Sequence, residues 1–154
     1  MAHWLLKSEP ETFGIHHLQA MPHEHWDGVR NYTARNNLMA MKFGEECFFY
    51  HSSCEIPGVV GVMRIVREAY PDPTQFDPAS KYFDPKATDE KPRWFCPDVE
   101  YVRTFPRTVS LREIKATPGL QDMSVAQASW SRLSVSPVSD KEWDIICELA
   151  ERPE

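Results

Sequence analysis

A short aromatic segment bounded by turn residues constrains the fold of this chain most. Residues 46–51 read Glu-Cys-Phe-Phe-Tyr-His, and a turn at residues 54–57 separates them from a longer apolar segment at residues 59–70. An apolar run of this length, rich in aromatics and flanked by turns, is typical of a buried strand. The longer segment begins apolar on both faces and ends in alternation, which also predicts a strand. The chain must therefore contain a sheet with a well-buried centre.

The remaining segments mix strands and helices without regular alternation. We expect strands at residues 3–7, 93–105 and 133–138, and helices at 13–21 and 31–41. Ser-x-x-Glu patterns at residues 110–113 and 139–142 predict capped helices ending near residues 118 and 149, and a turn at residues 8–11 could close a further capping box. Residues 71–92 hold five prolines and should form a surface loop. This order of expected strands and helices along the chain predicts an α+β fold. The architecture we expect is a small mixed β-barrel of five to six strands decorated by several short helices.

Length and composition favour one soluble domain across residues 1–154. Hydrophobic residues make up 42% of the 154, enough for a core, and no run of 18 apolar residues could span a membrane. The four cysteines show no paired spacing, so we expect free thiols. We expect a monomer in the cytoplasm of a bacterium, or in the nucleus if the source is eukaryotic.

Charge limits how the chain could meet nucleic acid. The formal net charge is −6, which argues against a protein that coats DNA or RNA through many phosphate contacts. Residues 28–42, however, hold Arg30, Arg35 and Lys42 and no acidic residue. A local cationic rim around a pocket therefore remains compatible with the sequence.

Signals of catalysis and metal binding are weak. The chain has no GxSxG, HExxH, P-loop or GxGxxG motif, and Cys96-Pro97 stands in the wrong order for a zinc deaminase. His16, His17, His23 and His25 lack the spacing of a structural zinc site, although the sequence alone leaves metal binding by them open. We predict no catalytic residue, metal or cofactor, while a cysteine nucleophile paired with a histidine stays an alternative.

The most informative stretch is residues 26–37, which combine an aromatic ring, two arginines and three asparagines around a helix start. Aromatic rings stack on bases, asparagine side chains bond base edges, and arginines bind phosphates. A purely structural interpretation stays open: Asn31 could cap the helix, Tyr32 could pack, and the arginines could be solvated. Further polar clusters occur at residues 7–10, 49–52 and 129–135, each also compatible with a turn or a packed strand end.

Together these clusters resemble the EVE domain family. The resemblance rests on residues 4–10 (Trp-Leu-Leu-Lys-Ser-Glu-Pro), 26–36 (Trp-Asp-Gly-Val-Arg-Asn-Tyr-Thr-Ala-Arg-Asn), 48–52 (Phe-Phe-Tyr-His-Ser), 69–72 (Ala-Tyr-Pro-Asp) and 132–138 (Arg-Leu-Ser-Val-Ser-Pro-Val). They occur in order and span nearly the whole chain. The resemblance implies a PUA-like barrel, related to YTH readers of methylated adenine, with a pocket for a modified base; for EVE domains the associated ligands are modified cytosines in DNA.

The resemblance also implies roles for individual residues. Trp26 would stack on the base, with Asn31 and Tyr32 on the helical rim, Lys7, Ser8, His51 and Ser52 at the strand ends, and Leu133 on the remaining side. Arg30, Arg35, Asn36 and Arg132 would contact the nucleic-acid backbone. Trp94 or Trp130 could supply a second aromatic wall.

We therefore predict a reader that accommodates a flipped, modified base, most simply a modified cytosine in DNA. The alternatives are an RNA-binding module of the PUA kind, a sensor of a free modified nucleoside, and a hydrolase acting on modified nucleic acid. Because a buried methylene contributes only about 0.8 kcal/mol, we expect modest selectivity for the modification.

Overall fold

The aromatic segment is an interior strand of a six-stranded sheet. In the computed structural model, which describes residues 1–153, it forms β3 (Glu46–His51), and the four residues from Cys47 to Tyr50 are all buried. The longer apolar segment forms β4 (Gly58–Pro71), which pairs with β3 in antiparallel register. Both strand predictions are confirmed. β3 and the first half of β4 are apolar because both of their faces are covered, whereas the second half of β4 is partly exposed.

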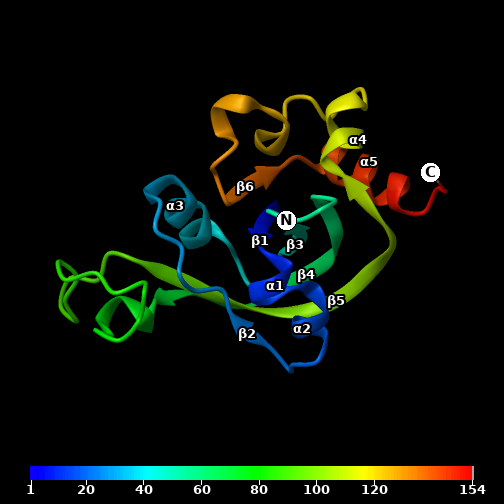
Figure 1. Cartoon of the computed structure of the whole chain (residues 1–154). Coiled ribbons are helices and arrows are strands. Elements are labelled where there is room, and N and C mark those ends of the chain that lie inside the picture. The colour runs from blue at the N-terminus through cyan, green and yellow to red at the C-terminus, as the bar shows by residue number, and fades with distance from the viewer. Residues whose placement is uncertain (154) are drawn as a thin grey trace.

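The other strands complete the order β2-β5-β4-β3-β1-β6. β1 (His3–Ser8) runs parallel to β3, while β6 (Val135–Val138) pairs with β1 and β2 (Glu24–His25) pairs with β5 (Phe95–Ser110), both in antiparallel register. In residues 1–153 the edge strands β2 and β6 do not pair with each other. The predicted closed barrel is thus wrong and the strand number right: the sheet is open, and the long strands β4 and β5 curve past the remaining strands (Figure 1).

Both faces of the sheet are covered, because neighbouring residues on a strand point to opposite sides. Leu6 and Phe49 belong to a core cluster with Trp26 and with the apolar faces of α2 (Ile15–Gln19) and α3 (Tyr32–Ala40). On the other face, Leu5 and Phe48 pack with residues of α4 (Leu111–Ala116) and α5 (Asp140–Ala150). β1 and β3 end side by side at Ser8 and His51, just before the chain enters α1 from β1.

Helix starts follow the predicted capping. Ser110 and Ser139 each accept a hydrogen bond from the backbone N–H three residues on, and Ser139 forms a full capping box with Glu142. The capping box predicted for the turn at residues 8–11 is wrong. Glu9 caps α1 (Pro10–Phe13) without its side chain, and the Ser8 hydroxyl instead donates to the Phe13 carbonyl at 2.7 Å.

Three further differences have local causes. The helix predicted at residues 13–21 splits into α1 and α2, because Gly14 between them is extended. β2 went unpredicted, since two residues carry no periodicity. Residues 124–130, for which no element is predicted above, contain two short 3-10 helices, η2 (Ser124–Ala126) and η3 (Ala128–Trp130).

The proline-rich loop after β4 lies at the end of the molecule opposite α4 and α5 (Figure 1). It contains one 3-10 helix, η1 (Pro73–Phe76), whose Gln75 is fully buried. The Gln75 amide donates to the carbonyls of Asp72 and Trp94 and accepts from the backbone of Arg93 and Trp94. The loop is therefore anchored from within. The four cysteines are unpaired, as predicted.

Candidate functional site

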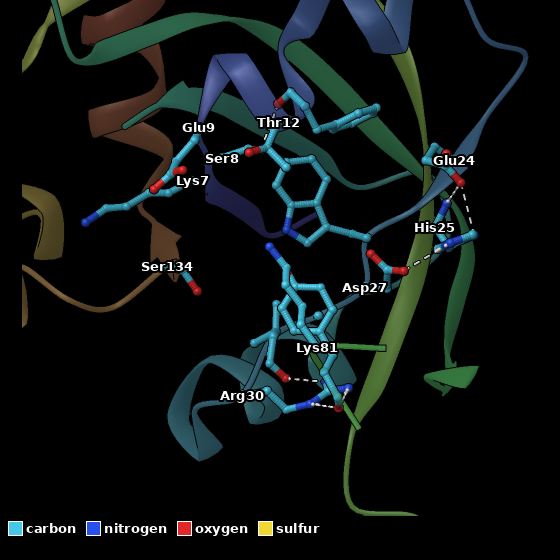
Figure 2. A pocket seen from close by; sticks show the side chains of 15 residues that line it. Lys7, Ser8, Glu9, Thr12, Glu24, His25, Asp27, Arg30, Lys81 and Ser134 are labelled. Carbon is cyan, nitrogen blue, oxygen red and sulfur yellow. Dashed lines mark hydrogen bonds and ion pairs between the residues drawn. The ribbon is translucent and has the colours of Figure 1, made fainter. Parts of the chain in front are cut away.

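A cavity of about 510 Å³ opens where five separate segments meet (Figure 2). The segments are the end of β1, helix α1, residues 24–30 around and after β2, the proline-rich loop and the residue before β6. The volume falls within the range of roughly 300–1,000 Å³ typical of small-molecule sites. The lining residues are Lys7, Ser8, Glu9, Thr12, Phe13, Glu24, His25, Trp26, Asp27, Gly28, Val29, Arg30, Lys81, Tyr82 and Ser134.

Trp26 joins the cavity to the core. Its side chain is only 7% exposed and packs edge-on against Phe49 and Phe13, with ring centroids 5.3 and 6.0 Å away. It nevertheless lines the cavity, and its Nε1–H has no hydrogen-bond partner within residues 1–153 and is not sealed from solvent. Packing therefore fixes the indole while leaving part of the ring and one donor free for a ligand.

A chain of polar side chains forms one wall. Figure 2 shows Glu24, His25 and Asp27 side by side, on the side of the cavity away from Lys7. His25 places Nδ1 3.0 Å from Glu24 Oε1 and Nε2 3.2 Å from Asp27 Oδ2. Desolvation by burial, with a contribution from the nearby Asp72 charge, raises the pKa of Asp27 although His25 opposes the shift. The Asp27 carboxyl is thus held by His25 and partly withdrawn from water.

The strand end supplies the opposite wall. Lys7 donates from Nζ to the Ser131 carbonyl at 3.0 Å, and burial lowers the pKa of its ammonium. Lys7 also lines a second cavity of about 300 Å³, together with Ser52 and Lys115 among others. Because Ser131 also lines the second cavity, the Lys7 ammonium lies on that side, and Figure 2 shows it pointing away from the middle of the main cavity.

Arg30 lines the cavity but is already engaged. Its guanidinium donates to the Val29 and Tyr82 carbonyls and to Thr74 Oγ1, and it forms an ion pair with Asp72 at 3.2 Å. Asp72 is 1% exposed and also accepts from the Gly28 backbone at 2.8 Å. The predicted phosphate contact of Arg30 thus conflicts with its geometry, because these bonds use the guanidinium to tie the loop to the cavity rim.

Gly28 allows that loop to approach. Its φ is +79°, a left-handed conformation, and a Cβ built there would lie 2.7 Å from Tyr82 Cζ. Glycine accepts this conformation without steric cost. The glycine therefore brings the Tyr82 ring to the cavity.

The predicted helical rim lies outside the cavity. The Asn31 side chain caps α3 by accepting from the Ala34 backbone at 2.9 Å, which is the structural interpretation left open above. Tyr32 is 51% exposed and stacks on Trp94 at 4.8 Å. Arg35 lies over the Tyr32 ring at 4.7 Å and bonds Asn36 Oδ1. These side chains form an exposed cluster beside the cavity.

Four other predicted residues also lie away from the cavity. His51 accepts a hydrogen bond from the Ile15 backbone at 3.1 Å, and burial with the nearby His16 lowers its pKa. Ser52 lines only the second cavity, Leu133 is buried in the core, and Arg132 is exposed. Of the twelve residues predicted from sequence, the main cavity brings together Lys7, Ser8, Trp26 and Arg30.

Sequence reasoning missed several lining residues. Asp27 lies inside the informative stretch at residues 26–37. Phosphate binding requires basic side chains and base edges are commonly bonded by amides, so this pattern gives an acidic side chain no role. Tyr82 and Lys81 come from the proline-rich loop, where no local pattern indicates which face a residue takes. Tyr82 lines the cavity, whereas Trp94 and Trp130, the expected second aromatics, do not.

Three of the four histidines left open for metal binding have contacts of their own. His17 accepts from the Gly14 backbone at 2.8 Å and lies beside the His16 ring, and His25 lies between two carboxylates. Within residues 1–153 no group of three or more histidine, cysteine or acidic side chains is arranged as a metal site. In the same part of the chain, no helix has the length and hydropathy to cross a membrane.

Comparison with known proteins gives one consistent result. The model of the EVE domain matches residues 2–149. Human thymocyte nuclear protein 1 is 44% identical over 170 residues, which cover 98% of this chain and 75% of the human protein. A crystal structure of a Pseudomonas syringae protein is 48% identical with a TM-score of 0.94, covering 97% of this chain and 99% of that one. The crystal structure of human THYN1 in complex with 5-methylcytosine-containing DNA is 43% identical, with a TM-score of 0.93 and full coverage of both chains.

Proposed function

The chain belongs to the EVE domain family, and on that premise we propose that its cavity receives one flipped, modified base, 5-methylcytosine in DNA. The human relative at 43% identity was crystallised with DNA containing this base. The proposal transfers that ligand class to this chain, whose fold matches the whole of the human chain in that crystal structure.

The observation that carries the proposal is that Trp26 is held by the core and still lines the cavity. A rigid indole with a free N–H faces a hollow of about 510 Å³, opposite a strand end that carries Lys7 and Ser8. An aromatic plate with a few polar groups is what a planar heterocycle requires. Because Trp26 is immobilised by the core, it would lose little conformational entropy on binding.

The free energy gained by stacking and hydrogen bonding is of the same order as the cost of flipping a base. Extracting a base from a duplex costs a few kcal/mol, and stacking on an aromatic side chain returns about 1–3 kcal/mol per base. Hydrogen bonds to the base edge supply the rest. The 5-methyl group adds about 0.8 kcal/mol if buried, which corresponds to roughly fourfold tighter binding. We therefore expect modest preference for the methylated base.

We further propose that the chain acts as a reader and performs no reaction on its ligand. We propose one PUA-like domain over residues 1–154, of which residue 154 lies outside the described part, working as a cytoplasmic monomer. The single sheet that joins elements from residue 3 to residue 138 supports the one-domain proposal. The mixed lining, with three basic and three acidic residues, supports recognition of one nucleotide more than coating of a duplex.

A titration with labelled oligonucleotides tests the function. Fluorescence anisotropy would compare a short duplex carrying one 5-methylcytosine with the same duplex unmodified, with RNA of the same sequence, and with the free nucleoside as competitor. We expect tightest binding of the methylated duplex. Preference for RNA, or saturable binding of the nucleoside alone, would favour the alternative functions, and product formation would establish a hydrolase.

A cavity-filling variant locates the binding. Ser134→Trp places a large side chain in the cavity and should weaken binding at least tenfold. Ser129→Trp, on the exposed surface of η3 and outside both cavities, is the matched control and should bind normally. Equal binding by both folded variants would show that the cavity is not the site.

A further inference from the structure

In residues 1–153 the Asp27 carboxylate forms no ion pair with a lysine or an arginine, and its ion-pair partner is His25. Its side chain is 30% exposed, and its neighbour His25 contacts only Oδ2. Figure 2 shows the other carboxylate oxygen turned away from His25, toward the middle of the cavity. A ligand in the cavity would therefore meet a hydrogen-bond acceptor at this wall.

Neighbouring side chains hold that acceptor in place. His25 bridges Asp27 and Glu24 through its two ring nitrogens, at 3.2 and 3.0 Å. His25 and Glu24 belong to β2, whose backbone pairs with β5, so the chain of contacts is anchored to the sheet. A carboxylate positioned in this way loses little entropy when it binds a donor, and its partial burial strengthens the bond to the ligand.

Pyrimidine bases differ at the position such an acceptor would read. Cytosine presents an N4 amino group, which donates, whereas thymine presents an O4 carbonyl, which accepts. Both 5-methylcytosine and thymine carry the same 5-methyl group, so neither the Trp26 plate nor an apolar contact separates them. Only a group that distinguishes donor from acceptor can do so.

We infer that Asp27 is the specificity-determining residue of the cavity and accepts a hydrogen bond from the exocyclic amino group of a cytosine base. This inference rests on the proposed function and adds to it the basis on which cytosine is separated from thymine. A carboxylate facing the thymine carbonyl is left without a donor. Such a mismatch costs about 1–3 kcal/mol, or about fivefold to more than a hundredfold in affinity.

The substitution Asp27→Asn gives a direct test, because an amide presents a donor as well as an acceptor. Two duplexes would be used, each with guanine opposite the central base, one with 5-methylcytosine and one with thymine. The quantity measured is the ratio of the two dissociation constants for wild type and variant. The wild-type ratio is then divided by the ratio of the variant. This division cancels the cost of flipping each base and isolates the coupling between Asp27 and the base.

We expect the variant to lose at least about fivefold in its preference for 5-methylcytosine over thymine, the lower end of that range. Asp27→Ser, which removes the carboxylate, should also reduce the preference without favouring thymine. Asp144→Asn, which makes the same change at an exposed position on α5 outside both cavities, is the matched control and should keep the wild-type ratio. Thermal unfolding of each variant establishes that it folds.

The outcomes separate the two proposals. If wild type binds the methylated duplex and Asp27→Asn weakens both duplexes equally or neither, Asp27 is a structural residue and the inference is overturned while the proposed function stands. If folded wild type binds neither duplex, the proposed function fails and the inference fails with it.

Discussion

Replacing Arg30 by methionine should destabilise the fold by about 3 kcal/mol. The substitution keeps much of the side-chain volume but removes the ion pair with Asp72, which is 1% exposed. Removing one partner of a buried pair costs about 3–5 kcal/mol because it leaves the other charge uncompensated. Asp72 keeps hydrogen bonds from Gly28 and Thr74, so we expect the lower end of that range.

Thermal and urea unfolding would measure this loss. For a domain of this size, about 3 kcal/mol corresponds to a fall of roughly 6–12 °C in Tm. Arg132→Met, on an exposed arginine, is the matched control and should leave Tm unchanged within about 1 °C. If Arg30→Met unfolds like wild type but binds DNA with a weaker salt dependence, Arg30 contacts phosphate and the structural role argued here is refuted.

Three further predictions follow from the cavity and its rim. Gly28→Ala should lower stability by at least about 1 kcal/mol in urea unfolding, because the left-handed backbone is strained for alanine and its Cβ meets Tyr82; unchanged stability would contradict this. Burial raises the pKa of Asp72, but hydrogen bonds from Thr74 and Gly28 and the Arg30 charge outweigh it and lower the pKa below its usual value. The ionised Asp72 carboxylate therefore stabilises the fold above the unfolded pKa of about 3.9, and this contribution is lost as pH falls through the folded pKa. The difference in free energy of unfolding between wild type and Asp72→Asn should shrink below about pH 4. A difference that does not change with pH would count against this role of Asp72. Lys7→Met should weaken DNA binding and reduce the slope of log affinity against log salt by about 1 if its ammonium meets a phosphate; an unchanged slope would exclude that contact.

The regular elements could be predicted because their signals are local. The buried aromatic strand β3 and the caps at Ser110 and Ser139 depend on neighbours within a few residues, and each lies where the pattern placed it. Closure of the sheet could not be predicted, because pairing of the edge strands depends on chain curvature over long distances. The open edges come from β2, which is too short to carry a pattern, and from β6.

The ligand-binding roles assigned from sequence stay predictions, and the structure shows only which of these residues line the cavity. Trp26, Lys7 and Ser8 line it, while the side chains of Asn31 and Arg30 have partners within the fold. A sequence shows that an arginine or asparagine is available for bonding but not which partner reaches it first. Arg30 meets a buried aspartate 42 residues away, which no local pattern indicates.

The most direct test of the proposed function is a crystal structure of the chain bound to a short duplex with one 5-methylcytosine. We predict that this base lies outside the helix, in the cavity, with its ring against Trp26 and its amino group within hydrogen-bond distance of the Asp27 carboxylate. A complex in which the base stays stacked in the duplex, or in which the cavity holds no base, would contradict the central claim.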